Sequence, residues 1–139
     1  MKTKEIINLL KFCRKKKQKV FICGNGGSAC NAIHFAEDLM GCGIRVIALT
    51  DIGFLTATAN DKGYRYVFSR PLKVLADTGD ILVTLSTSGT SKNIVEAIQT
   101  AQKMNLQVVS FPTNKELKKT TPQTENKHLE IIHDIVTKL

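Results

Sequence analysis

Four short apolar runs, separated by longer amphipathic segments, constrain the fold of this chain more than any other feature. The runs cover residues 19–23, 45–49, 80–85 and 107–111. Continuous apolar runs are typical of strands that are covered on both faces. Strands that alternate with helices predict a parallel sheet with helices packed on both sides. We therefore predict an α/β fold, a three-layer α/β/α sandwich around a central parallel sheet.

The segments between the runs carry helical signals of unequal strength. A first helix is expected to be capped by Thr3, since Ile6, Leu10 and Cys13 recur at helical spacing. The other expected elements are a helix over 28–40, a short helical turn and polar loop after residue 54, a helix from about Pro71, helices over 92–104 and 125–139, and a turn-like stretch over 112–124.

Composition narrows the class of protein. A length of 139 residues with 42% hydrophobic and 23% charged residues suits one folded domain, which we assign to residues 1–139. No apolar run reaches the ~20 residues of a membrane span, and the first residues show no signal-peptide core, so we expect a cytoplasmic protein. The cysteines Cys13, Cys23, Cys30 and Cys42 form no CxxC pair, which favours free thiols in a reducing compartment over a zinc cluster.

The net charge of +8 favours anionic partners. Part of the excess lies in residues 14–19, which suits either the solvated end of a helix or a surface for a polyanion. Six Phe and two Tyr residues, without Trp, are not interleaved with the basic residues. A nucleic-acid stacking surface is therefore poorly supported.

In parallel sheets ligands bind beyond the carboxyl ends of the strands, which directs attention to the loops that follow the runs. The first loop, Gly24-Asn25-Gly26-Gly27-Ser28-Ala29, precedes a helix. Its glycines would let a ligand approach the backbone, and a helix start presents free N–H groups to an anion. The same loop fits the dinucleotide fingerprint G-x-G-x-x-A, with Asp51 after the next strand, and a tight turn without any ligand also remains open.

A second loop, Ser86-Thr87-Ser88-Gly89-Thr90-Ser91, places five hydroxyls in six residues before a helix. Hydroxyls and helix-start N–H groups together favour a phosphate. Ordinary helix capping is the alternative, although a cap needs only one Ser or Thr.

These loops belong to a set of motifs that resembles the sugar isomerase (SIS) domain family, in particular its phosphoheptose isomerase branch. The matching motifs are the glycine loop, His34-Phe35-Ala36, Thr58-Ala59-Asn60-Asp61, Gly63-Tyr64, Val67-Phe68-Ser69-Arg70, Gly79-Asp80, Ser86-Thr87-Ser88-Gly89, and the closing-helix His128 and His133. The resemblance implies a flavodoxin-like SIS fold. It also implies isomerisation of sedoheptulose 7-phosphate to D-glycero-D-manno-heptose 7-phosphate for bacterial lipopolysaccharide or capsule, sites at the interfaces of a homo-oligomer (dimer or tetramer), and zinc as a metal.

Matching position by position carries the family's roles onto this chain. The resemblance implies substrate contacts from Asn25, Gly26, Gly27, Ser28, Asn60 and Asp61, and a phosphate cradle from Ser86, Thr87, Ser88 and Ser91. It implies that His34 is a metal ligand and that His133 is both a ligand and an acid-base group.

Two positions depart from the family's pattern. Asp38 stands where the family has its catalytic Glu, and Glu125 stands where it has a Gln. Both replacements keep an oxygen donor, so we expect Asp38 to act as base and metal ligand, and Glu125 to contact substrate and metal. The chain is also shortened in its leading helical arm, between Leu39 and Ile44, and after Phe111, and we expect a last strand to be absent.

Helix geometry bears on these assignments. His34 and Asp38 are four residues apart and share a helix face, as a metal site or a surface hydrogen-bonded pair would require. Glu125 and His133 are eight residues apart, about 12 Å along a straight helix, so one ion would need long reach from both. His128 lies between them and suits a structural role.

Three functions remain distinct at this point. The first is a phosphosugar isomerase that works through an enediol, with Asp38 and His133 as base and acid. The second is a non-catalytic SIS regulator that binds a phosphosugar or a replication initiator, which the presence of His133 disfavours. The third is a nicotinamide-dependent oxidoreductase, for which only half of a dinucleotide fold is matched.

Overall fold

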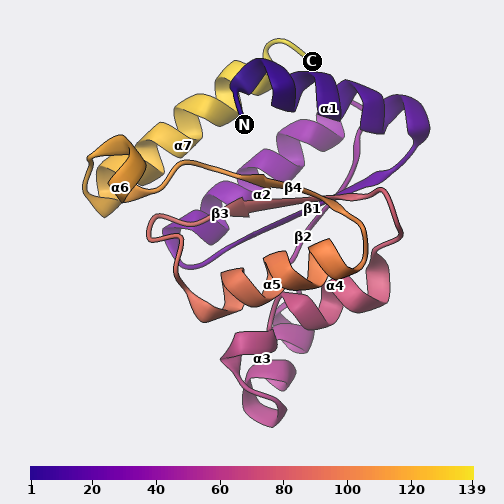
Figure 1. Cartoon of the computed structure of the whole chain (residues 1–139), viewed down its shortest axis with the longest axis vertical. Coiled ribbons are helices and arrows are strands. Elements are labelled where there is room, and N and C mark those ends of the chain that lie inside the picture. Colours follow the sequence, from indigo (N-terminus) through magenta and orange to yellow (C-terminus); the bar gives the residue numbers. More distant parts are fainter.

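Helices and strands alternate along the computed structural model, which describes all residues from 1 to 139. The elements in chain order are α1 (Thr3–Lys16), β1 (Lys19–Gly24), α2 (Gly27–Gly41), β2 (Arg45–Ala48), α3 (Ile52–Asp61), the 3₁₀ turn η1 (Tyr64–Tyr66), α4 (Ser69–Leu75), β3 (Ile81–Leu85), α5 (Lys92–Lys103), β4 (Gln107–Ser110), α6 (Asn114–Leu117) and α7 (Thr121–Val136). All four apolar runs form strands, as predicted (Figure 1).

The strands form one parallel sheet in the order β2-β1-β3-β4. This is the flavodoxin-like order 2-1-3-4-5 without a fifth strand, in agreement with the expectation that a last strand is absent. A dinucleotide-binding sheet would order its strands 3-2-1-4 instead, so β1 would not lie beside β3. The strand order therefore argues against the oxidoreductase interpretation.

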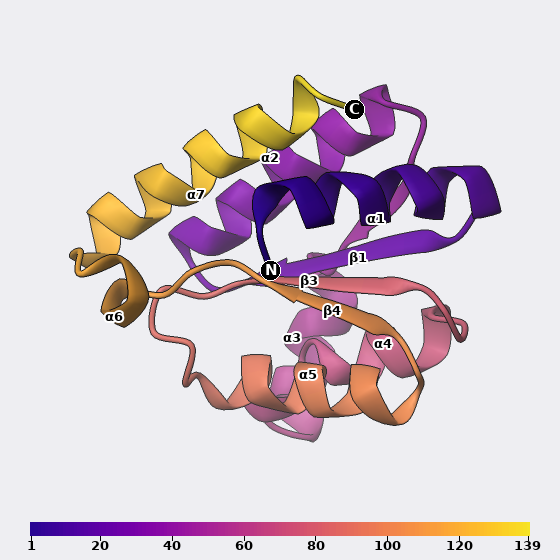
Figure 2. The same ribbon diagram turned by 45° about the horizontal axis from the view of Figure 1, so that its top comes forward.

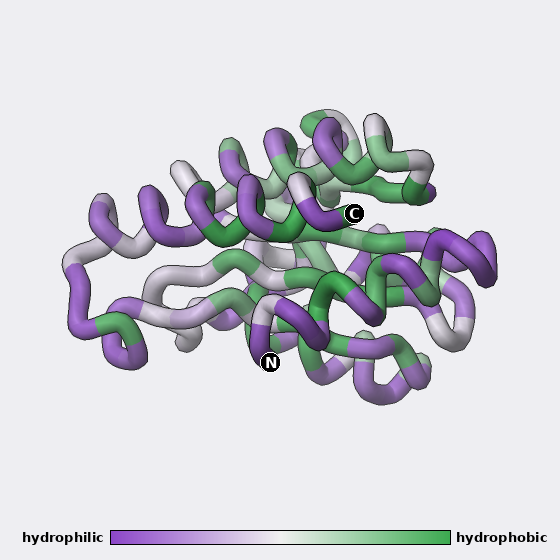
Figure 3. Tube along the Cα trace, turned by 90° about the horizontal axis from the view of Figure 1, so that it is seen from above, coloured by the Kyte–Doolittle hydropathy of each residue, from purple (hydrophilic) through white to green (hydrophobic).

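Helices cover both faces of the sheet, which confirms the three-layer sandwich (Figure 2). One face is covered by α1, α2 and α7, whose buried side chains include Leu10, Phe35 and Ile132. The other face is covered by α3, α4 and α5, with Leu72 and Ile94 in the core. Hydropathy also differs between the strands and the helices that cover them. The strands are mostly apolar or neutral, while the helices alternate polar and apolar residues along their length (Figure 3). None of the helices combines the length and apolar character needed to cross a membrane.

A buried carboxylate joins the starts of β1 and β3. Asp80 is 2% exposed and accepts hydrogen bonds of 2.8 Å from the backbone N–H groups of Lys19 and Asp77. The Lys19 ammonium lies 3.1 Å from the same carboxylate and 2.6 Å from that of Asp77. Because the buried charge is both paired and hydrogen-bonded, it is tolerated where an unpaired one would not be.

Several helix boundaries differ from the sequence prediction. Helix α3 begins at Ile52, in place of a short turn after residue 54, because the Asp51 carboxylate accepts from the Phe54 N–H at 2.8 Å and caps the helix. Helix α4 begins at Ser69, so Pro71 is its third residue. The N-cap of α1 is Lys2 and not Thr3, and the Glu5 carboxylate accepts from the Lys2 N–H at 2.8 Å.

The stretch expected to be turn-like also contains helix. Residues 114–117 form α6, capped by Thr113, whose hydroxyl and Glu116 make a capping box. Helix α7 begins at Thr121, four residues before the predicted start, with Thr120 and Gln123 as a second capping box and a proline in its first turn.

The four cysteines are free thiols in the structure. Burial raises the pKa of the Cys23 thiol to about 12, and burial together with the charge of Asp80 raises the pKa of the Cys13 thiol to about 11. Both therefore stay protonated near neutral pH and pack as small apolar side chains.

The end of β1 is pressed against two other backbone segments. A Cβ atom on Gly24 would lie 2.7 Å from the backbone oxygen of Ser28 and 2.9 Å from that of Leu85. These atoms belong to α2 and to the partner residue of Gly24 on β3, so neither can move without disturbing the sheet. Glycine is required here by close approach rather than by backbone dihedral angles.

We expect Gly24→Ala to lower the free energy of unfolding by about 1–3 kcal/mol, because the added methyl group overpacks a junction made of backbone. Gly41→Ala is the matched control, since nothing lies within 4 Å of a Cβ there and Gly41 is in a helix. Urea denaturation of both variants tests the difference. Equal stability of the two variants would contradict the proposed close approach.

Candidate functional site

The glycine loop and the hydroxyl-rich loop meet at the carboxyl edge of the sheet, because β1 and β3 are adjacent and parallel. Between them lies a hollow of about 240 Å³. Its lining includes the expected residues Asn25, Gly26, Gly27, Ser28, Ser86, Thr87, Ser88, Ser91 and Glu125, and also Leu85 and Thr121. Thr121, at the start of α7, was not foreseen, since no local motif connects it with these loops.

The hydroxyl-rich loop leaves donors free for a ligand. The Ser86 hydroxyl accepts from the Gly89 N–H at 3.0 Å and shapes the turn. Ser91 is the N-cap of α5, yet its side chain makes no capping hydrogen bond and lies 3.4 Å from the Ser88 hydroxyl. Ordinary capping therefore does not account for the cluster. The Ser88 hydroxyl also accepts from the Thr90 N–H at 3.2 Å. Hydroxyls that keep donor capacity beside the start of a 12-residue helix suit an anionic oxygen.

A side-chain network holds the glycine loop against α5. The amides of Asn25 and Asn93 exchange two hydrogen bonds, of 3.0 Å and 2.8 Å. The Tyr64 hydroxyl adds a third, donated to Asn25 at 3.2 Å. Asn93 is 2% exposed, so its amide is fixed by the core. Asn93 and Tyr64 were not foreseen as positioning residues, and an Asn in the first turn of a helix is the one local signal for the first of them.

Glu125 enters the hollow from α7. A Cβ on Gly27 would lie 2.6 Å from its Oε1 atom, so the carboxylate rests directly on the glycine loop. The Asn31 amide donates to the Glu125 backbone carbonyl at 3.0 Å and ties α7 to α2. Glu125 thus lines the hollow together with the glycine loop and the hydroxyl-rich loop.

A second cluster lies farther along the same pair of helices. One ligand atom from each of His34, Asp38 and His133 lies within 4.8 Å of the others. His34 Nε2 is 3.1 Å from Asp38 Oδ2, and the two imidazole rings are 5.3 Å apart between centroids. Two imidazoles and a carboxylate form a donor set that suits zinc and leaves a coordination position for another ligand. The structure does not bring Glu125 into this group.

The hollow and the cluster are separated along α2. His34 follows Gly27 by seven residues, which is about 10 Å along the helix axis. His34 and His133 are exposed, and Asp38 is half-buried. The cluster is therefore accessible to a ligand held in the hollow only if that ligand is extended.

Asn60 and Asp61 lie apart from both groups of residues. They are exposed at the end of α3, where the Asn60 amide donates to the Asp61 carboxylate at 2.9 Å, and neither lines the hollow. Tyr64, three residues after Asp61, connects this segment to the glycine loop through Asn25.

His128 is a core residue and not part of the cluster. Its side chain is buried, its Nε2 lies 2.7 Å from the Pro112 carbonyl, and its ring packs edge-on against Phe111. A carbonyl can only accept, so Nε2 carries the hydrogen and the buried Nδ1 has no partner. Burial lowers the pKa of His128, although the hydrogen bond to Pro112 and the charge of Glu125 oppose this. The sequence-based interpretation of His128 as structural agrees with this placement.

Comparison with known proteins gives the SIS domain family and phosphoheptose isomerases as relatives. The model of the SIS domain matches residues 2–112. The phosphoheptose isomerase of Campylobacter concisus is 52% identical over 104 residues, which are 70% of this chain and 55% of that protein. The phosphoheptose isomerase of Cytophaga hutchinsonii is 36% identical over 143 aligned positions, which cover 88% of this chain and 74% of that protein.

A solved structure has the same fold over almost the whole chain. The phosphoheptose isomerase from Neisseria gonorrhoeae superposes with a TM-score of 0.90 at 33% sequence identity, over 97% of this chain and 83% of that one. The chain spans 53% to 74% of the length of the curated relatives it matches.

We expect acidification to weaken the fold partly through His128. The pKa of His128 is lowered in the folded state. Below pH 6.5, the ordinary pKa of histidine, the unfolded chain therefore binds a proton at this residue while the buried ring stays neutral. The contribution of His128 to the free energy of unfolding is therefore complete above pH 6.5 and decreases as the pH falls. The decrease reaches at most about 1.4 kcal/mol near pH 5.5. His128→Gln, which keeps a donor for Pro112, should show a smaller loss between about pH 7.5 and 5.5 in urea denaturation. Identical losses in the two proteins would contradict this assignment.

Proposed function

Because this chain belongs to the SIS domain family, and within it to the phosphoheptose isomerases, we propose that it interconverts sedoheptulose 7-phosphate and D-glycero-D-manno-heptose 7-phosphate. The observation that carries the proposal is the pairing of a hydroxyl-lined hollow with a His–Asp–His cluster along the same two helices, α2 and α7. Residues 1–139 would act as one SIS domain.

The separation of the two groups of residues suits this substrate. A ketoheptose 7-phosphate carries its phosphate at one end of the carbon chain and its carbonyl next to the other end. With the phosphate in the hollow, an extended seven-carbon chain would direct the carbonyl end along α2, toward the cluster about 10 Å away. Phosphate binding would then supply the energy that positions the reacting carbons.

We assign the phosphate to the hydroxyls of Ser86, Thr87, Ser88 and Ser91 and to the N-terminus of α5. The glycine loop, from Asn25 to Ser28, would contact the sugar through its backbone. Glu125 lines the same hollow, and its carboxylate would accept hydrogen bonds from sugar hydroxyls. Asn60 and Asp61 are proposed as further sugar contacts, although they lie outside the hollow in this structure.

Ketose–aldose conversion moves one proton between adjacent carbons and another between their oxygens. We propose that the Asp38 carboxylate removes the proton from C1 of the ketose to give an enediol, and that the proton is returned at C2 of the aldose. His133 would transfer the proton between O1 and O2, because imidazole can both donate and accept near neutral pH. The His34 imidazole, whose Nε2 atom lies 3.1 Å from Asp38 Oδ2, would orient the carboxylate.

The donor set also suits a metal ion. His34, Asp38 and His133 are the residues that would hold zinc, because their ligand atoms already lie together. A zinc ion bound there would act as a Lewis acid that polarises the carbonyl. Glu125 would have to turn out of the hollow to become a fourth ligand.

We further propose that the working form is a homo-oligomer. Exposed apolar side chains cluster on α2 and beside the edge strand β2, where Ile33 is 51% and Met40 is 62% exposed. Together with Val46 and Ala48 they line an open apolar groove. A surface of this kind on one chain is suited to a second copy.

Ser88→Ala should weaken binding of a heptose phosphate by about 1–3 kcal/mol, because a hydrogen bond to a charged oxygen is lost. Thr90→Ala is the matched control, since Thr90 belongs to the same loop and is exposed but does not line the hollow. Titration calorimetry would measure both affinities. Equal weakening by the two substitutions, or by neither, would argue against a phosphate in this loop.

Asp38→Asn and His133→Ala should each lower kcat by roughly 10²-fold or more, with phosphate affinity nearly unchanged. Asp38→Glu should keep or raise the rate, since it only lengthens the side chain toward the family's residue. Asp134→Asn, at the exposed position of α7 next to His133 and outside the cluster, should leave the rate unchanged.

The enediol has its own signature, because solvent deuterium should enter the carbon that receives the returned proton. NMR of the sugar phosphate during turnover would detect it. A protein that binds the sugar phosphate yet neither converts it nor exchanges deuterium, with or without zinc, would be a non-catalytic phosphosugar-binding regulator instead.

A further inference from the structure

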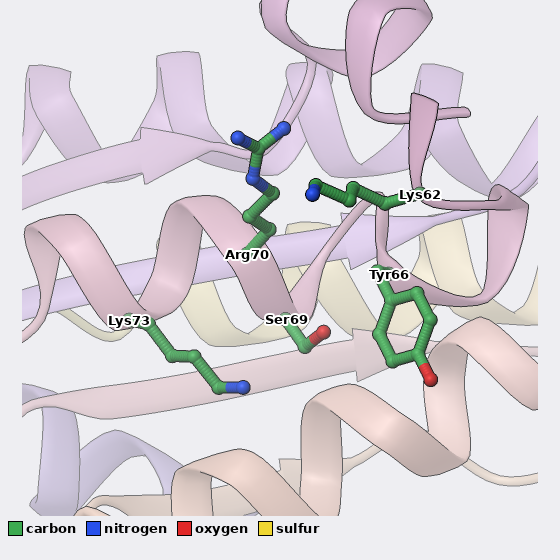
Figure 4. Close-up of a pocket in the computed structure, with 5 residues that line it drawn as sticks. All are labelled: Lys62, Tyr66, Ser69, Arg70 and Lys73. Atoms are coloured by element: carbon green, nitrogen blue, oxygen red, sulfur yellow. The ribbon is translucent and has the colours of Figure 1, made fainter. Parts of the chain in front are cut away.

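A basic hollow lies between the end of α3, η1 and α4 (Figure 4). Helices α3 and α4 lie on the opposite side of the sheet from α1, α2 and α7 (Figure 1). The volume of the hollow is about 260 Å³, and it is lined by Lys62, Tyr66, Ser69, Arg70 and Lys73. None of these residues lines the hollow between the glycine loop and the hydroxyl-rich loop. We refer to it as the α3–α4 pocket.

The cations of the α3–α4 pocket have no carboxylate partner. Lys62, Arg70 and Lys73 form no ion pair, and no acidic residue lines the pocket. The side chains of Lys62 and Arg70 converge from α3 and α4 (Figure 4). Like charges repel when they approach, so an anion between them would stabilise this arrangement.

Two residues of α3, Thr58 and Phe54, hold the Arg70 side chain in place. Its guanidinium donates to the hydroxyl of Thr58 at 3.2 Å and lies 4.9 Å from the centre of the Phe54 ring. Thr58 is fully buried, so this support belongs to the core. A guanidinium that is already oriented loses less side-chain entropy when it binds an oxyanion.

One lining residue of the α3–α4 pocket carries a buried hydroxyl without a hydrogen-bond partner. Ser69 is 0% exposed, lines the pocket, and its Oγ makes no hydrogen bond. A buried polar atom that lacks a partner costs free energy, and such atoms are rare in folded proteins. A ligand oxygen that reached it from the pocket, after a small adjustment of the side chains around it, would supply the missing partner.

We propose that the α3–α4 pocket binds the phosphate monoester of a small molecule, at a site separate from the isomerase site. A phosphate dianion would neutralise two of the three positive charges and accept from both guanidinium and hydroxyl donors. Arginine and lysine with a hydroxyl are the donors that recognise phosphate in proteins. The Tyr66 ring forms one wall, against which the organic part of the ester would pack.

A small ligand fits better than a polymer. The cations surround one hollow and do not form a stripe, whereas a nucleic acid would require charges spaced along its backbone. A second basic group of the chain, Arg14–Lys17, lies at the end of α1 on the opposite face of the sheet (Figure 2). The two groups therefore cannot form one continuous track.

The test is a titration of the full ¹⁵N-labelled chain with inorganic phosphate, followed by amide NMR shifts. Amides of residues 62–73 should shift and saturate with their own Kd, apart from those of residues 86–91. Glucose 6-phosphate and AMP, each compared with its unphosphorylated parent, distinguish a sugar phosphate from a nucleotide as the source of the phosphate. Sodium chloride at matched ionic strength controls for screening.

Two substitutions assign the binding to the pocket. Ser69→Ala should weaken phosphate binding there by about fivefold while the chain remains at least as stable, because the hydroxyl has no partner to lose. Lys73→Gln should weaken it by about tenfold. Lys103→Gln, an exposed lysine at the end of α5 that lies outside the pocket, should leave it unchanged.

The shifts at residues 86–91 report the other site and should be the same in all three variants. The proposal is overturned if residues 62–73 do not shift with phosphate or shift equally with chloride. It is also overturned if Ser69→Ala and Lys73→Gln bind phosphate as the parent chain does.

Discussion

The close approach of β1 to β3 at Gly24 is the constraint on which the candidate site depends. Gly24 pairs with Leu85, and no side chain fits between Gly24 and the backbone of Ser28 and Leu85. Because the two strands are parallel and in contact up to their last residues, their following loops emerge side by side. The glycine loop can therefore be held through Asn25 by an asparagine of α5, and a hydroxyl-lined hollow forms between the loops. The buried Asp80 carboxylate joins the opposite ends of the same two strands.

Helix α2 connects this hollow with the chemistry proposed for the other end of the substrate. It begins in the glycine loop and carries His34 about two turns and Asp38 about three turns later, while α7 packs beside it and supplies His133. The Asn31 bond to the backbone of Glu125 sets where α7 lies along α2. This alignment brings His133 to the cluster and leaves Glu125 at the hollow. One pair of helices thereby determines both which residues meet and how far apart the two groups are.

The two proposed phosphate sites would attract an anion through different interactions. The hollow at the sheet edge offers hydroxyls and the start of a helix and also contains a carboxylate, so its attraction for an anion is directional and short in range. The α3–α4 pocket offers three unpaired cations around one buried hydroxyl, so its attraction includes net charge and extends farther. Increasing salt should therefore affect the second more strongly than the first. The distinction follows from the residues that line each hollow, since no Lys or Arg lines the one at the sheet edge.

Local sequence was sufficient for the strands, the long helices and the two loops, because apolar periodicity and glycine or hydroxyl clusters act over a few residues. The starts of α3 and α7 and the short α6 were predicted wrongly because they depend on side-chain caps that compete with turn-forming residues. The i,i+4 pair of His34 and Asp38 was evident from the sequence. The meeting of this pair with His133, the position of Glu125 at Gly27, the Asn25–Asn93 lock and the unpartnered Ser69 hydroxyl were decided only by tertiary structure. Each of these joins segments far apart in the chain, and their distances depend on how helices pack on the sheet, which no local pattern encodes.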